Sequence, residues 1–315
     1  MMRKNQKSKL TSFFVILCIL LPLFMGGCQA YQTFSDRARE DFRDWKDTDT
    51  DLTKRILMGP MEVKTFYDLP EKNALVAKAI MEKIPAKRFE IVSVGAGGVP
   101  MEVWQSLSPS NQKTDSIALA TVARQYGLNA FVRYGFDDVR PTSKSSGFWW
   151  FRKVKYLSEA QFFVEIYDAE TGTKIFDELF MFDQKLFGED EYVELQDEQI
   201  VEIPNLDKHI RKLGNDMGES ITKVLNKVYW KGYVTAVDGA VITFTGGTKS
   251  GITTGKKFGI YATRVSAQGK SGYYFRPGDR IAEVQVTSVS ADKIEAKVLS
   301  GSGIQVGDTV HRTER

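Results

Sequence analysis

The chain has 315 residues, of which 42% are hydrophobic and 12% aromatic, so it can build a large core and is not a disordered protein. Its formal net charge of +3 is too small to indicate nucleic-acid binding. The only cysteines, Cys18 and Cys28, exclude a disulfide-dense fold and a cysteine-rich zinc site. Because the two histidines, His209 and His311, lie far apart in the sequence, we expect no histidine-built metal site and no cofactor.

Residues 1–27 have the pattern of an export signal. Basic residues precede an apolar run over 10–25, which is long enough for a signal-peptide core and short for the ~20 residues that span a bilayer. The run ends in Met-Gly-Gly-Cys at 25–28, which resembles the cleavage box of bacterial lipoproteins. The resemblance implies cleavage before Cys28 and acylation of that residue, palmitate included, while Gln29 resembles an outer-membrane sorting signal. The alternative is an uncleaved membrane anchor.

Cleavage would also change the charge. Residues 1–27 contain four basic and no acidic residues, so their removal turns +3 into −1 and leaves Cys28 as the one thiol. Residues 28–57 are rich in charge and poor in apolar side chains, which predicts a tether between the lipid and the folded part.

Residues 58–230 alternate between strand-like and helix-like patterns. Period-two alternation and β-rich runs predict strands at 61–67, 89–94, 130–136, 160–167 and 174–182. Helical spacing predicts helices from Pro70 to about Ile84, from a Thr114-Asp115 cap to Gly127, and over 206–228. The turn 168–172 joins the last two strands as a hairpin. The order predicts an α+β fold, with helices packed on one mixed sheet.

Residues 231–315 are dominated by strand-like runs and glycine turns. A repeat at an offset of 52 residues aligns 234–258 with 286–310, with eight identities in 25 positions. In both copies a Ser-Gly-Ile-x-x-Gly unit, at 250–255 and 302–307, supplies two turns before a strand. The segment therefore predicts a small all-β barrel.

Two resemblances follow from these patterns. The step at 123–132 (ARQYGLNAFV) and the hairpin at 160–179 (AQFFVEIYDAETGTKIFDEL) look like parts of CsgG/TolB-N-terminal-like periplasmic domains. The barrel at 231–315 is similar to the C-terminal domain of FlgT-like flagellar assembly proteins, which have a further N-terminal domain that is absent here. The domain order fits FlgT-like proteins, whereas the lipid anchor fits CsgG-like and LpoB-like lipoproteins better. Together the resemblances imply a periplasmic assembly or scaffold protein.

Catalytic motifs are weak in this sequence. The glycine cluster at 94–100 lacks the third glycine of G-x-G-x-x-G and the Lys-Ser/Thr of a P-loop, which favours a flexible connection. Neither histidine accompanies a Gly-x-Ser-x-Gly elbow. The carboxylates of Glu189-Asp190-Glu191 belong to an acidic run that is typical of a solvated loop. A carboxylate-based glycosidase stays an alternative, because its two carboxylates can be far apart in sequence and form no local motif.

The most informative local feature is a cluster of aromatic and basic residues between two predicted strands. It follows a Ser/Gly turn and consists of Phe148, Trp149, Trp150, Phe151, Arg152 and Lys153. Successive side chains of a strand face opposite sides, so a sheet cannot bury all four aromatics on one face. Three interpretations stay open: contact with a membrane, docking onto a protein partner, and packing against the chain itself.

These observations predict a non-catalytic lipoprotein, anchored by lipid to the outer membrane and facing the periplasm. Its task would be to scaffold a cell-envelope assembly, such as the flagellar basal region or a CsgG-type secretion system. Expected partners are the membrane and envelope proteins but no nucleic acid, and a homo-oligomer is compatible with the pattern. The alternatives are an LpoB-like activator of a peptidoglycan synthase and a carboxylate-based hydrolase of wall glycans.

Overall fold

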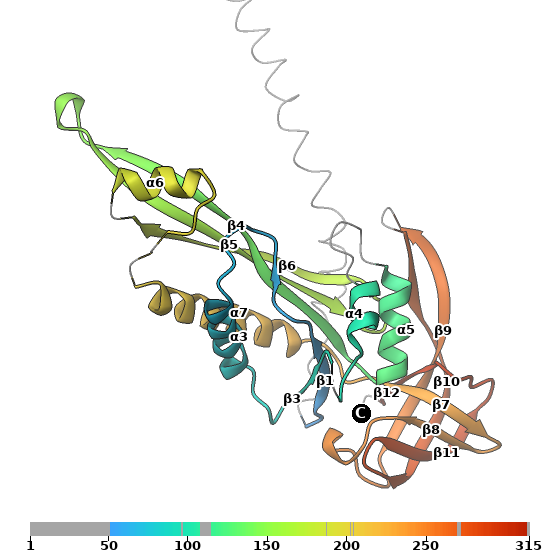
Figure 1. Ribbon diagram of the computed structural model, residues 1–315. Coiled ribbons are helices and arrows are strands. Elements are labelled where there is room, and N and C mark those ends of the chain that lie inside the picture. The colour runs from blue at the N-terminus through green and yellow to red at the C-terminus, as the bar shows by residue number, and fades with distance from the viewer. Residues whose placement is uncertain are drawn as a thin grey trace, which may run out of the picture. The chain divides into compact units, whose positions relative to one another are not determined.

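The computed structural model describes residues 51–95, 97–107, 115–186, 188–201, 203, 205–269 and 272–313. Cys28, the predicted signal at 1–27 and nearly all of the predicted tether lie outside these residues. The described chain has the predicted α+β fold, with helices packed on a mixed sheet and a closed antiparallel β-barrel (Figure 1).

The sheet has the strand order β3-β1-β4-β5-β6, with the short β2 (Glu62–Val63) beside β4. Its strands are β1 (Lys54–Met58), β3 (Phe89–Ser93), β4 (Ala130–Ser146), β5 (Lys153–Asp168) and β6 (Lys174–Lys185). β1 is parallel to β3 and β4, whereas β4, β5 and β6 form antiparallel pairs.

Two strand predictions need correction at the start of this sheet. The tether was expected to reach residue 57, yet 54–58 form β1, a strand between β3 and β4 that is almost completely buried. The sequence Lys-Arg-Ile-Leu-Met was not predicted as a strand because it begins with two basic residues, which are typical of an exposed segment. The Lys54 Nζ reaches the carbonyls of Leu225 and Asn226, at 3.3 and 3.1 Å, so the buried ammonium is hydrogen-bonded. The strand predicted at 61–67 is limited to the two residues of β2.

Helices α3 (Pro70–Lys83) and α7 (Leu206–Leu225) cover one face of the sheet, as the apolar spacing predicted. They pack closely because glycines of α7 face α3. A Cβ at Gly214 would lie 2.6 Å from the Cβ of Ala79, and one at Gly218 would lie 2.7 Å from the carbonyl oxygen of Ile80. The close approach of the two helices therefore depends on these glycines.

Helices α4 (Met101–Leu107) and α5 (Ser116–Tyr126) pack with other residues of β1, β3 and β4 in a hydrophobic core that is separate from the one beneath α3 and α7. Asp115 caps α5 as predicted, since its carboxylate accepts the N–H groups of Ile117 and Ala118, and Gly127 ends the helix in the left-handed conformation. Sequence analysis missed α4. Its seven residues are too few to establish a helical period, although they bury Trp104 and Leu107.

The glycine cluster is a turn with its own hydrogen bonds. The N–H of Gly95 donates to the carbonyl of Val99 at 2.8 Å, and the N–H of Val99 donates to that of Ser93 at 3.1 Å. Gly95 has a φ of 108°. The cluster thus joins β3 to α4 in place of the flexible connection that was expected.

The C-terminal part is the predicted barrel, closed in the order β10-β11-β8-β7-β12-β9. Its strands are β7 (Gly232–Asp238), β8 (Val241–Thr245), β9 (Lys257–Gly269), β10 (Gly272–Val289), β11 (Lys293–Gly301) and β12 (Thr309–Arg312).

The sequence repeat corresponds to two halves of this barrel. β7, β8 and the start of β9 occupy the positions that the end of β10, β11 and β12 occupy in the second half. Ile242 and Ile294 are aligned in the repeat, and both are completely buried in the barrel core. The second glycine of each unit, Gly255 and Gly307, has a positive φ, 84° and 94°, so both turns need glycine.

Candidate functional site

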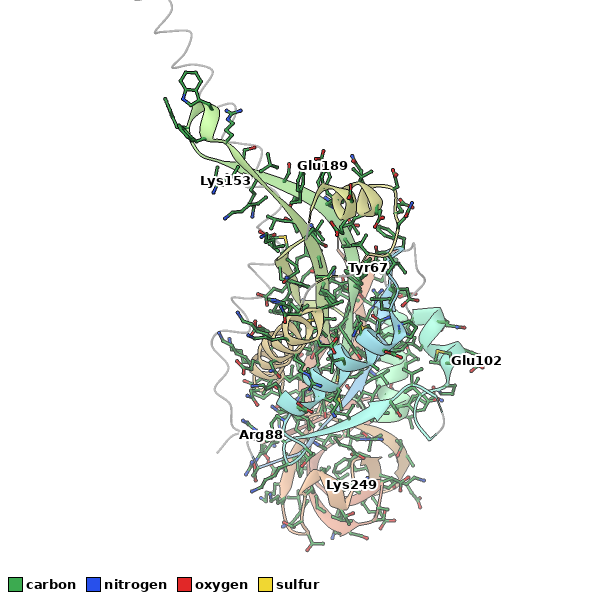
Figure 2. The ribbon with its side chains drawn as sticks, turned by 60° about the vertical axis from the view of Figure 1, so that its left-hand side comes forward. Tyr67, Arg88, Glu102, Lys153, Glu189 and Lys249 are labelled. Carbon is green, nitrogen blue, oxygen red and sulfur yellow. The ribbon has the colours of Figure 1, made fainter. Side chains whose placement is uncertain are left out.

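The aromatic and basic cluster lies at the end of an extended hairpin. β5 pairs with β6 only from Leu157 onward, while its pairing with β4 continues to the Ser146–Lys153 rung. The carbonyl of Tyr156 still accepts the N–H of Leu186 at 3.0 Å, and from Lys155 to the tip the described backbones of β4 and β5 pair only with each other. We call residues 140–156 the arm, and Figures 1 and 2 show it extending past helix α6.

The tip of the arm is a tight turn. The carbonyl of Phe148 accepts the N–H of Phe151 at 3.0 Å, and residues 149–151 form one turn of 3-10 helix. Gly147 has a φ of 113°, and a Cβ there would lie 2.2 Å from the carbonyl oxygen of Phe151. Glycine is therefore required at this position, which explains the Ser/Gly run before the aromatics.

The structure leaves the tip aromatics exposed to solvent. The exposed fractions of Phe148, Trp150 and Phe151 are 84%, 78% and 76%. The side chain of Trp149 lies outside the described part of the structure. The exposure of Phe148 and Phe151 favours contact with a membrane or a protein over packing against the chain itself, because packed side chains would lose most of it. All three interpretations stay predictions.

Positive charge accompanies the aromatics. Residues 139–158 contain Arg140, Lys144, Arg152, Lys153 and Lys155 and no acidic residue. Arg140 pairs with Asp138, and Lys144 pairs with Asp183 of β6. Among the described residues, the other three cations make no ion pair. Lys144 and Lys155 are directly opposite each other in the ladder, an arrangement of like charges that does not stabilise a hairpin.

At the base of the arm lies α6 (Glu189–Gln196), in place of the solvated acidic loop that was predicted. The carboxylate of Glu191 accepts the N–H of Gly188 at 2.8 Å, and three acidic residues in the first turn suit the positive end of the helix dipole. The ring of Tyr192 lies 5.1 Å from that of Tyr156 on β5. In Figure 2, Lys153 lies on the arm beyond Glu189 of α6, so the basic tip and the acidic helix are separate surfaces.

A second group of charged residues was missed by sequence analysis. Lys231, Asp168 and Glu170 are each only 3% exposed. The Nζ of Lys231 donates a hydrogen bond to Asp168 and lies 3.8 Å from a carboxylate oxygen of Glu170. The Nε2 of His311 lies 3.4 Å from the Glu170 carboxylate, and the guanidinium of Arg124 donates to the Glu170 carbonyl at 3.2 Å. We call these five residues the Lys231 cluster.

The Lys231 cluster joins the sheet to the barrel. Asp168 ends β5, Glu170 lies in the β5–β6 turn, Arg124 is in α5, Lys231 precedes β7, and His311 is in β12. Burial by itself raises the pKa of the Glu170 carboxyl, but His311, Lys231 and Arg124 lower it to about 2. The partners are so far apart in sequence that no local motif identifies them. Each charge has a neighbour of opposite sign, so the cluster is a structural connection rather than a site with a free functional group.

Neither histidine lies in an arrangement that indicates catalysis. His311 is part of the Lys231 cluster, and the ring of His209 stacks on Phe182 with the centroids 6.2 Å apart. Within the described ranges, no three or more His, Cys, Asp and Glu side chains are grouped as a metal would require.

The cavities of the described chain include one apolar cavity and two clefts lined by charged residues. A cleft of about 420 Å³ lies between α3 and α7, where Lys83 pairs with Glu219 at 2.7 Å and Lys223 and Lys227 also line the wall. An apolar cavity of about 30 Å³ between α3, α7 and the sheet has room for about one water molecule. A cleft of about 270 Å³ lies between β1, β3 and the barrel. Three of its charged residues form ion pairs, since the Glu90 carboxylate lies 3.3 Å from the Nε of Arg55 and 3.2 Å from the Nζ of Lys249.

None of the described helices combines the length and hydropathy that crossing a bilayer requires.

No protein-family model matches the chain, and no curated protein matches it. Several solved structures show limited similarity. A hypothetical protein, CT253, from Chlamydia trachomatis has 12% identity and a TM-score of 0.34, over 54% of this chain and 96% of that one. Lipoprotein GNA1162 from Neisseria meningitidis has 9% identity and a TM-score of 0.25, over 46% and 93%. The PelC dodecamer from Paraburkholderia phytofirmans has 9% identity and a TM-score of 0.29, over 54% and 88%.

At these identities and TM-scores, the similarities establish neither a fold family nor a function for this chain. The resemblances to CsgG/TolB-N-like and FlgT-like proteins therefore stay predictions. The arm, at whose tip Phe148 and Phe151 are exposed to solvent, is the feature of the described chain that most clearly indicates a contact surface.

Proposed function

We propose that the protein is a non-catalytic lipoprotein, anchored to the outer membrane through Cys28, that scaffolds a cell-envelope assembly and uses the arm as its contact element. The exposed aromatic tip carries this proposal. Monomeric soluble proteins rarely expose contiguous apolar patches of large area, and such patches mark interaction sites. Tryptophan and arginine are also the residue types that contribute most to contact surfaces.

The base of the arm continues into the packed sheet, which supports a role in contact. β4 and β5 continue from the tip into the sheet, where Val132, Val164 and Ile166 are completely buried. A hairpin that begins in a packed core keeps its tip in a defined direction, so less entropy is lost when the tip binds. The protein would thus present a pre-formed contact element at a fixed place relative to its sheet.

The flagellar basal region and a CsgG-type secretion system are the assemblies that the sequence resemblances suggest. Both would use the protein to bind and position other components, which fits a chain whose buried charged groups pair with one another. The proposal assigns no chemistry to the carboxylates of α6, and a zymogram with the purified protein would detect wall-glycan hydrolysis if they act as an enzyme.

The experiment places a photocrosslinking amino acid at Phe148 and, as a control, at Val306. Val306 is an apolar barrel residue with an exposed fraction of 67%, so both positions are accessible in the isolated protein. In living cells we expect a specific adduct from position 148 and none from position 306. No adduct at 148, or the same adducts from both positions, would contradict a contact role for the arm.

A further inference from the structure

We propose that the arm tip binds the anionic phospholipid headgroups of a bilayer surface, without crossing the bilayer. This inference rests on the proposed function and specifies what the arm contacts. Three observations carry it: the charge of the arm, the reach of its tip beyond α6, and the length of chain that precedes β1.

The charge of the tip favours an anionic lipid surface. Arg152, Lys153 and Lys155 make no ion pair within the described residues, so they are available to phosphate groups. The aromatic side chains next to them are of the type that lies at the headgroup level, where a ring is half in apolar and half in polar surroundings. A neutral apolar pocket on a protein would leave these three cations without partners, which costs free energy.

The reach of the tip fits an interfacial depth. The Tyr156–Tyr192 contact places α6 beside the Ser143–Tyr156 rung, and three further rungs plus the turn lie beyond it. At about 3.3 Å per residue the tip extends about 15 Å past this level. That is enough to enter the headgroup region and the adjoining acyl boundary, ~5–10 Å deep, but not the ~30 Å of a hydrocarbon core.

Helix α6 limits this depth. Its carboxylates, Glu189, Asp190, Glu191 and Glu194, make no ion pairs within the part of the chain that the structure describes. An anionic bilayer repels them when the arm enters far enough to bring α6 to the surface. The basic tip is thus attracted and the acidic base repelled, which fixes a shallow insertion.

The anchor and the tip can reach the same membrane. From Cys28 to Lys54, where β1 begins, the chain spans at most about 90 Å when fully extended. β4 has 17 residues, which is about 55 Å of strand, and with the start of β1 and the turn the tip lies about 65 Å from Lys54. The available chain exceeds this distance, so lipid anchor and arm can bind one surface together.

The test uses the full lipidated protein in vesicles, with an environment-sensitive fluorescent amino acid in place of Phe148 or, as a control, Val306. Vesicles are either pure phosphatidylcholine or one third phosphatidylglycerol, and some contain spin-labelled lipids that quench by depth. We expect a blue shift and shallow quenching at position 148 on anionic vesicles, and neither at position 306. The same response on neutral vesicles, or no response at 148, would overturn the inference.

Two charge-matched variants test the role of the cations. The arm variant is Arg152→Gln, Lys153→Gln and Lys155→Gln; the control is Lys208→Gln, Arg211→Gln and Lys212→Gln, at exposed positions of α7. Each cation near an anionic surface strengthens association about fivefold, so the arm variant should insert roughly a hundredfold less and the control should insert normally. Equal insertion by both variants would overturn the inference.

The outcomes separate the inference from the proposed function. Flotation of the vesicles reports whether the chain is anchored, whereas the emission at position 148 reports whether the tip inserts. A chain that does not float contradicts the lipid anchor and hence the proposed function. A chain that floats with a solvent-like emission at 148, and that crosslinks to a protein in cells, overturns the lipid inference and leaves the proposed function intact.

Discussion

Replacing Glu170 by Gln removes one charge from the Lys231 cluster while keeping the size of the side chain. The ordinary pKa of a glutamate is 4.5, and the cations around Glu170 lower it to about 2 in the folded protein. This depression corresponds to about 3 kcal/mol of folding free energy at neutral pH. Because the folded pKa is the lower one, the stabilisation is complete above pH 4.5 and is lost as the pH falls from 4.5 towards 2.

Urea unfolding, followed by circular dichroism at several pH values, measures this contribution. The Glu170→Gln variant should be about 3 kcal/mol less stable than the parent at neutral pH, and the difference should disappear near pH 2. Glu194→Gln is the control, because this exposed α6 carboxylate makes no ion pair among the described residues; its effect should stay within about 0.5 kcal/mol. Equal stability of Glu170→Gln and parent at neutral pH, or a loss that does not vary with pH, would contradict a stabilising charge at Glu170.

Three further predictions concern the helices and the arm. Gly218→Ala should destabilise the protein in urea by about 1–3 kcal/mol although alanine favours helices, because its Cβ would lie 2.7 Å from the carbonyl oxygen of Ile80; a gain in stability would contradict the close packing of α3 and α7. Asp115→Ala should cost about 1 kcal/mol in the same assay through loss of the α5 cap, and Asp115→Asn should restore most of it. The pair Trp150→Ser and Phe151→Ser should leave the melting temperature unchanged but reduce crosslinking from the photoreactive residue at position 148, whereas unfolding would indicate packing within the chain.

The elements that sequence predicted well are those with an extended pattern or a local chemical signature. Helix α7 has twenty residues, enough to show a helical stripe, and the cap at Asp115 is readable from a single residue. The barrel was predicted from its repeat, whose glycines need a positive φ in both halves. Such signals depend only on residues that are close in the sequence, so they can be recognised without a structure.

The elements that sequence missed depend on distant residues. β1 begins with Lys54, whose ammonium donates hydrogen bonds to carbonyls at the end of α7. This lysine is therefore buried, although its charge led to the prediction of an exposed tether. The acidic first turn of α6 is stabilised by the positive end of the helix dipole. In the sequence alone, the same acidic run is typical of a solvated loop. The Lys231 cluster combines four distant parts of the chain, and no pattern in any one of them predicts it.

Sequence analysis located the arm tip but not its geometry. The four aromatics and two basic residues at 148–153 were grouped because such a run cannot be buried on one face of a strand, and their role as a contact site stays a prediction. How far β4 and β5 extend past β6 was not predictable, since the exposed rungs have the polar composition of a loop. That extension is what places the tip beyond α6.

Chemical protection of the tip in isolated cell envelopes tests the central claim most directly, namely that the arm is bound to something in the envelope. A cysteine at position 148 is compared with one at position 306, and both react with a water-soluble maleimide before and after detergent. The account predicts that Cys replacing Phe148 is protected until detergent is added, while Cys replacing Val306 reacts in both conditions. Equal and rapid reaction at both positions in intact envelopes would contradict it.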